Sequence, residues 1–113
     1  MRRAFFAILV ALIPVLGTVK PATAQTVDDS IPALTSRAQK GDADAQNSLG
    51  LMYRNGQGVP QHHVLAHMWY NLAGAQGVAD ALKYRDRLAS KMTPAQIAEA
   101  QHLAAQWQRK GPP

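Results

Sequence analysis

The chain contains no cysteine among its 113 residues. Disulfide bonds are therefore excluded, and so is a structural zinc site with cysteine ligands. Attachment of a lipid to a cysteine behind an N-terminal apolar segment is excluded for the same reason. A small domain that lacks these links depends on side-chain packing for its stability.

Recognisable catalytic arrangements are also missing. Glu99 is the only glutamate, and no pair of acidic residues has a spacing typical of general acid–base catalysis. The chain has no G-x-S-x-G motif and no phosphate-binding glycine loop. We therefore expect no catalytic residue and no cofactor, which makes a small cell-envelope hydrolase the least favoured interpretation.

Long apolar runs are scarce, and the longest covers residues 4–16 near the N-terminus. Arg2 and Arg3 precede it, and the small residues Ala22, Thr23 and Ala24 follow it. This order is typical of a cleaved secretory signal peptide, and the run is shorter than the roughly 20 apolar residues of a membrane span. We predict a signal peptide over residues 1–24 and a flexible lead-in over residues 25–29. The protein would then be exported to the periplasm or the exterior, without stable membrane insertion.

Charge is modest once this segment is removed. The whole chain has 12 basic and 7 acidic residues and a net charge of +5. Arg2, Arg3 and Lys20 lie in the predicted signal peptide, which leaves 9 basic and 7 acidic residues and a net charge of +2. Proteins that bind nucleic acids usually carry a strong basic patch or stripe, so nucleic acid is not an expected partner.

The rest of the chain has helical periodicity throughout, and no segment has the pattern of a strand. Asp42 and Thr93 are predicted N-caps, and Gln96 completes a capping box with Thr93. We expect an all-α domain over residues 30–110 with about five helices, the last a C-terminal capping helix. The expected helices cover residues 30–40, 42–54, 61–75 (starting at Gln61 or His62), 78–92 and 94–110.

An internal repeat is visible at an offset of 36 residues. Gly41, Asp44 and Ala45 recur in the same order as Gly77, Asp80 and Ala81. A period of this length, built from two helices, is typical of helical-repeat proteins.

The segment GDADAQNSLGLMYRNGQGVPQ, followed by LAHMWYNLAGAQG, closely resembles the Sel-one-like repeat, a relative of the tetratricopeptide repeat. The resemblance covers one full repeat, at about residues 41–77, with partial repeats or caps on both sides. The positions that it marks as structural are Ala45, Leu49, Gly50, Met52, Tyr53, Gly56, Gly58, Pro60, Ala66, Trp69, Tyr70, Ala73 and Gly77.

This resemblance implies a short α/α solenoid that binds another protein as an adaptor or scaffold, without a cofactor. Solenoids generally need about three repeats for stability, whereas this chain has one complete repeat. Two alternatives follow: the flanking helices cap the repeat, or the chain associates with itself or with a partner.

Alignment with the tetratricopeptide repeat predicts which residues face the groove. In the first helix of the repeat these are Asp44, Asn47, Leu51 and Arg54. At the 36-residue offset the next helix contributes Asp80, Lys83, Arg87 and Ser90, with Lys91 adjacent. The basic members can bind an acidic segment or a C-terminal carboxylate. The alternative is an ordinary solvated helix face.

Histidines supply the rival interpretation, a periplasmic metal-binding protein. His63 and His67 are four residues apart, so they share a helix face and can reach one metal ion. A zinc site needs at least one more protein ligand, so we assign no metal site. The aromatic residues Tyr53, Trp69, Tyr70 and Trp107 follow the apolar stripes and are expected in the core.

Overall fold

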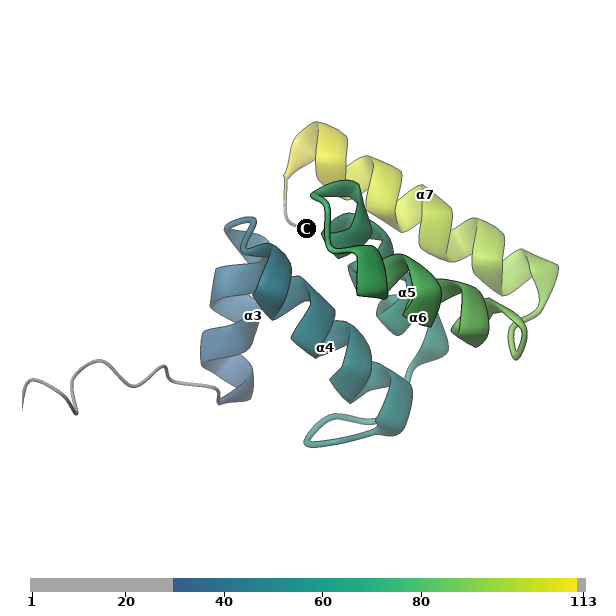
Figure 1. The fold of residues 1–113 in the computed structure, drawn as a ribbon, viewed down its shortest axis with the longest axis horizontal. Helices are drawn as coiled ribbons and strands as arrows, with labels where there is room; N and C mark the ends of the chain where they lie inside the picture. Colours follow the sequence, from purple (N-terminus) through teal and green to yellow (C-terminus); the bar gives the residue numbers. More distant parts are fainter. Residues whose placement is uncertain (1–29, 112–113) are drawn as a thin grey trace, which may run out of the picture.

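The computed structural model describes residues 30–111, and this part of the chain is all-α, with five helices and no strand. The helices are α3 (Ile31–Gln39), α4 (Ala43–Asn55), α5 (His63–Ala75), α6 (Ala79–Ala89) and α7 (Pro94–Lys110), as labelled in Figure 1. The predicted signal peptide and lead-in lie outside the described residues. Within the described part, no helix is both long enough and apolar enough to cross a membrane.

Helices α4 and α7 begin at the predicted caps, Asp42 and Thr93, and α3 begins at Ser30. Ser30 caps α3 by accepting a hydrogen bond from the Ala33 N–H, and Pro32 lies in the first turn. Asp42 caps α4, where its Oδ1 accepts from the N–H groups of Asp44 and Ala45 at 3.0 and 3.1 Å. Thr93 and Gln96 form the complete capping box of α7. Each cap pairs N–H groups that have no partner within the helix itself.

The predicted start of α5 at Gln61 or His62 is wrong by one or two residues. His62 has an extended backbone and serves as the N-cap, and its Nδ1 accepts from the Leu65 N–H at 3.2 Å. Gln61 points back to the preceding helix, where its Nε2 donates to the Arg54 carbonyl at 2.8 Å. These two side chains cap opposite helix ends, so the helix begins only after both.

The 36-residue repeat is visible in the geometry of two turns, the one before α4 and the one before α6. Gly41 and Gly77 have φ angles of +98° and +103°, in the left-handed region that favours glycine. In each turn the next residue donates its N–H to the carbonyl five positions earlier, Asp42 to Arg37 at 3.0 Å and Val78 to Ala73 at 3.2 Å. The two sequence matches therefore form the same local structure.

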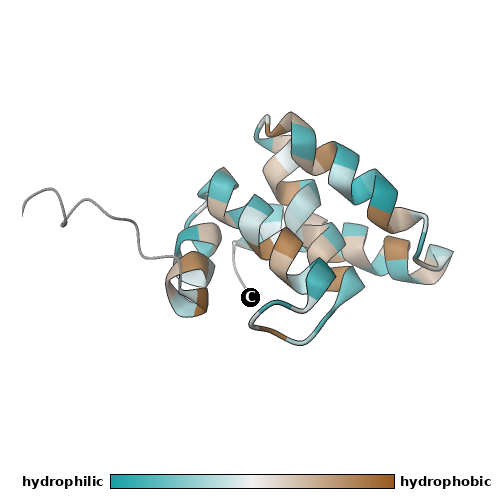
Figure 2. Cartoon of the chain, turned by 60° about the horizontal axis from the view of Figure 1, so that its bottom comes forward, coloured by the Kyte–Doolittle hydropathy of each residue, from teal (hydrophilic) through white to brown (hydrophobic). Residues whose placement is uncertain are grey.

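Helix α5 lies at the centre of the domain and packs against α4, α6 and α7 (Figure 1). Eight of its 13 residues are buried: Val64, Ala66, His67, Met68, Trp69, Tyr70, Leu72 and Ala73. The sequence pattern predicts a single apolar face through Ala66 and Ala73. The structure buries more of the helix because it has neighbours on three sides. In Figure 2 the other helices alternate between hydrophobic and hydrophilic residues, as expected where one side faces solvent.

Two groups of buried side chains form the core. The first joins α3, α4, α5 and α7, and consists of Leu34, Ala38, Ala45, Leu49, Met68, Trp69, Leu72 and Ala104. The second joins α5, α6 and α7 and the turn between the last two, and consists of Val64, Ala66, Tyr70, Ala73, Ala81, Leu88, Met92 and Ala100. Trp69 and Tyr70 are buried, while Tyr53 and Trp107 are half-buried and packed against the core. The predicted core role of these four aromatic residues is confirmed.

Helix α4 comes very close to a side chain of α5 at Gly50. A Cβ atom at this position would lie 2.6 Å from two ring carbons of Tyr70, a distance that real Cβ atoms do not adopt. Tyr70 is fully buried, so its ring has no free space into which to move. Gly50 thus permits the close packing of α4 against α5, and the side chain of Tyr70 occupies the space.

A buried amide joins the ends of three elements. Gln46 on α4 is fully buried, and its Nε2 donates to the Ala38 carbonyl at 3.1 Å. Its Oε1 accepts from Nε2 of Gln76, the residue that caps the end of α5, at 2.9 Å. Because both polar ends of the amide are paired, its burial leaves no unsatisfied group.

We expect Gly50→Ala to lower the free energy of unfolding by about 1–3 kcal/mol, the usual cost of overpacking a well-packed interior. Helix propensity alone predicts the opposite sign, because alanine is favoured over glycine by up to about 1 kcal/mol. Urea denaturation followed by circular dichroism measures the difference. In a Tyr70→Leu background the cost of Gly50→Ala should shrink, and a stabilising effect in the wild-type background would contradict the packing account.

Candidate functional site

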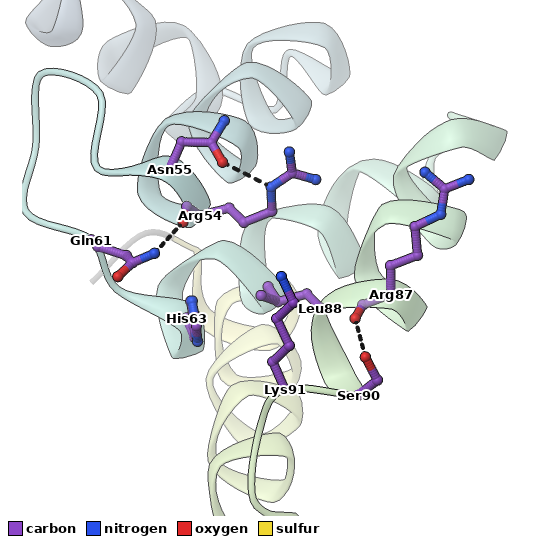
Figure 3. A pocket seen from close by; sticks show the side chains of 8 residues that line it. All are labelled: Arg54, Asn55, Gln61, His63, Arg87, Leu88, Ser90 and Lys91. Atoms are coloured by element: carbon purple, nitrogen blue, oxygen red, sulfur yellow. Dashed lines mark hydrogen bonds between the residues drawn. The ribbon is translucent and has the colours of Figure 1, made fainter.

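A cleft of about 670 Å³ lies where α4 and α6 end (Figure 3). Its lining comes from three separate segments of the chain, and it contains four side chains that are basic or can become so. The lining residues are Arg54 and Asn55 at the end of α4, Gln61 and His63 around the start of α5, and Arg87, Leu88, Ser90 and Lys91 at and after the end of α6. No acidic side chain is among them.

Local hydrogen bonds hold the backbone around this cleft. Gln61 covers the Arg54 carbonyl, and the Ser90 hydroxyl donates to the Arg87 carbonyl at 2.7 Å. The Arg54 Nε donates to the Asn55 Oδ1 at 3.1 Å, which orients the guanidinium group along the end of α4 (Figure 3). The last-turn carbonyls of both helices are thus partly paired, and the ends of the Arg87 and Lys91 side chains point away from these bonds (Figure 3).

The charges of the cleft are not compensated by nearby carboxylates. Within residues 30–111 the ion pairs are Arg37 with Asp42 at 3.8 Å and Arg85 with Asp86 at 2.9 Å, and neither pair lines the cleft. Arg54, Arg87 and Lys91 form no ion pair with the described residues. An anionic group entering the cleft would therefore meet several free donors.

The structure brings together only part of the predicted groove. Arg54, Arg87 and Lys91 line one cleft, together with Ser90. The other predicted groove residues, Asp44, Asn47, Leu51, Asp80 and Lys83, do not line it. Asp44 and Asp80 lie in the first turns of α4 and α6, at the opposite ends of these helices, and Asn47 is half-buried. The cleft is thus confined to the C-terminal ends of the two helices and does not follow their whole length.

Four lining residues are absent from the predicted set: Asn55, Gln61, His63 as a cleft residue, and Leu88. The 36-residue offset contains a signal for one of them, because it relates Asn55 to Lys91 in the same way as it relates Arg54 to Ser90. Gln61 lies in the connection between α4 and α5, and His63 is the first residue of α5 directly after it. Their place in the cleft follows only from the path of that connection.

The histidine pair is divided between two environments. His63 is half-buried and lines the cleft, whereas His67 is 3% exposed and lies in the interior. The Nδ1 atom of the neighbouring His62 is engaged in capping α5. Across residues 30–111 no three histidine, aspartate or glutamate side chains lie close enough together to hold a metal ion. The metal-binding interpretation therefore gains no third ligand from the fold.

Two buried groups have shifted pKa values, and neither lines the cleft. Burial lowers the pKa of His67, and the positive charge of Arg85 lowers it further, while Asp86 opposes the shift. Burial raises the pKa of Tyr70, against a smaller opposing effect of Arg54. Burial thus favours the neutral form of both side chains, which suits a packing role. The hydrolase interpretation, which needs a perturbed group in a pocket, gains no support from them.

Comparison with protein-family models finds no match for this chain. A search of curated proteins also finds no match. The resemblance to the Sel-one-like repeat thus stays a prediction that rests on the residues quoted above.

Acid should destabilise the fold through His67. Its folded-state pKa lies below the unfolded value, so its contribution to stability is present above the unfolded pKa and is lost as the pH falls. We expect the unfolding free energy of the wild type to fall more steeply between about pH 7.5 and about pH 5 than that of His67→Leu, measured by urea denaturation. His102→Gln, on the exposed side of α7, is the matched control and should keep the wild-type slope. Parallel curves for wild type and His67→Leu would refute this role.

Proposed function

We propose that this chain is an exported helical-repeat module that binds a partner protein by holding an acidic segment in the basic cleft. The observation that carries the proposal is the convergence of Arg54, Arg87 and Lys91 on one cleft that contains no acidic side chain. A carboxylate-bearing ligand would supply the charge that the cleft lacks.

The chemistry of the lining favours a peptide. Arginine guanidinium groups pair with carboxylates through two parallel hydrogen bonds, and two of the three permanent cations are arginines. Asn55 and Ser90 add neutral polar groups, and Leu88 adds an apolar one. A segment with carboxylates, backbone amides and apolar side chains matches this mixture better than a bare inorganic anion does.

Support for a solenoid-type arrangement comes from the repeated turns and from the order of helix packing. Helix α3 packs against α4, α4 against α5, and α5 against both α6 and α7. We assign the full repeat to residues 41–77, with α3 before it and α6 and α7 after it. The solvent side of α7 is polar, with Gln101, His102 and Gln108 exposed, as expected for a terminal capping helix.

Export can be tested by the mass of the mature chain. We expect the protein produced in a bacterium with a secretory pathway to be recovered from the periplasm or medium, with Gln25 as its first residue. Intact-mass spectrometry checks the loss of residues 1–24. Recovery of the uncut chain from the cytoplasm would refute export, and would leave the cleft proposal unaffected.

Binding can be tested with a fluorescein-labelled octaglutamate peptide and an octalysine control. We expect octaglutamate to bind and octalysine not to bind. The fluorescence anisotropy of bound octaglutamate should fall as the salt concentration is raised, because salt screens the charges. Combining Arg54→Gln with Arg87→Gln should weaken binding about ten- to thirtyfold, because exposed charge pairs contribute up to about 1 kcal/mol each.

The matched control combines Arg109→Gln with Lys110→Gln. Both residues are exposed at the end of α7 and lie outside the cleft. The double substitution removes the same total charge as the cleft variant does. We expect binding within about threefold of wild type. Equal losses in the two double variants, or no binding of octaglutamate at about 50 mM salt, would refute the cleft as a binding site.

A further inference from the structure

A second, smaller pocket of about 300 Å³ adjoins the basic cleft. This pocket is lined by Gln61, His62, His63, Val64 and Gln96. Gln61 and His63 line both cavities, so the two are neighbours at the start of α5. Together they form a path from the end of α6 over the first residues of α5 to the first turn of α7.

The second pocket presents hydrogen-bond donors. The Nδ1 atom of His62 accepts from the Leu65 N–H, so in the neutral imidazole the proton lies on Nε2 and is available to a ligand. The Oε1 atom of Gln96 accepts from the Thr93 N–H in the capping box. This bond leaves the two N–H groups of the Gln96 amide as donors. In both His62 and Gln96 the acceptor atom is therefore hydrogen-bonded within the fold, and the N–H donors are available to a ligand.

The start of α5 adds to this character. His63 and Val64 are its first two residues, and N–H groups at these positions have no partner within a helix. The positive end of the helix dipole lies at the same place. Neither pocket has an acidic side chain in its lining. Both cavities therefore favour ligands that are rich in hydrogen-bond acceptors.

We propose that the partner segment is an extended acidic stretch that fills both cavities, with its carboxylates on Arg54, Arg87 and Lys91 and its continuation hydrogen-bonded by His62 and Gln96. This inference rests on the function proposed above and adds the length of the segment and two further specificity residues. The occupant is a peptide segment of a partner protein, because a continuous chain of carbonyl and carboxylate acceptors suits donors arranged along a path.

Peptide length separates the two cavities experimentally. At about 3.3 Å per residue, an extended tetraglutamate spans roughly 13 Å and an octaglutamate roughly 26 Å. We expect the basic cleft, which carries the fixed charges, to hold the shorter peptide. We expect only the longer peptide to reach His62 and Gln96 as well.

Gln96→Glu is the decisive variant. Glutamate serves in a capping box as well as glutamine does, so the start of α7 is preserved while the amide donors are replaced by a carboxylate. We expect octaglutamate to bind about five- to tenfold more weakly, and tetraglutamate to bind within about twofold of wild type. Gln101→Glu adds the same charge at an exposed position of α7 outside both pockets, and should leave both peptides within about twofold.

His62→Asn provides a second variant without a change of formal charge. Asparagine is a preferred N-cap, so α5 keeps its start while the imidazole donor is lost. We expect a loss of about two- to fivefold for octaglutamate and none for tetraglutamate. Circular dichroism and thermal unfolding verify that each variant is folded.

The possible results separate the two proposals. Octaglutamate binding that depends on Arg54 and Arg87, but is equally insensitive to Gln96→Glu and Gln101→Glu, would overturn this inference and leave the proposed function intact. Failure of both peptides to bind would overturn both. Stronger binding to phosphatidylglycerol vesicles than to octaglutamate, with the same dependence on Arg54 and Arg87, would replace the peptide with a membrane surface.

Discussion

The contact between Gly50 and Tyr70 sets the distance between α4 and α5, and the arrangement of the other helices depends on it. With no side chain at position 50, the Tyr70 ring lies against the backbone of α4 and is fully buried. The ring also lies near that of Tyr84 on α6, with centroids 5.7 Å apart. The Tyr70 side chain of α5 thus contacts both α4 and α6. The short distance between α4 and α5 lets the neighbouring helices bury most of α5.

Polar links then fix the ends of these helices. Gln46 joins the end of α3 to the end of α5 through two hydrogen bonds, one buried and one partly buried. The matching turns at Gly41 and Gly77 start α4 and α6 in the same way. Both helices pack against neighbours that include α5, and the residues of their last turns meet in one cleft.

Basic residues at helix C-termini have a structural explanation, since they offset the negative end of the helix dipole. The helix dipole accounts for the presence of Arg54 at the end of α4 and, separately, for that of Arg87 at the end of α6. It does not account for a lining that combines them with Lys91 and has no carboxylate near them. Further donors lie at His62 and Gln96, because only the acceptor atoms of these two side chains are hydrogen-bonded within the fold. An acceptor-rich ligand is the simplest counterpart of such a surface.

The sequence by itself determined what depends on neighbours within about one helical turn. The all-α class, the caps at Asp42 and Thr93, and the repeated glycine turns are all of this kind, because cap and turn hydrogen bonds join residues that are close in the chain. Only the tertiary structure decided the burial of His67, the bond between Gln46 and Gln76, and the place of Gln61 and His63 in the cleft. These features depend on how whole helices pack against α5, and the pattern of a single helix does not contain the positions of its neighbours.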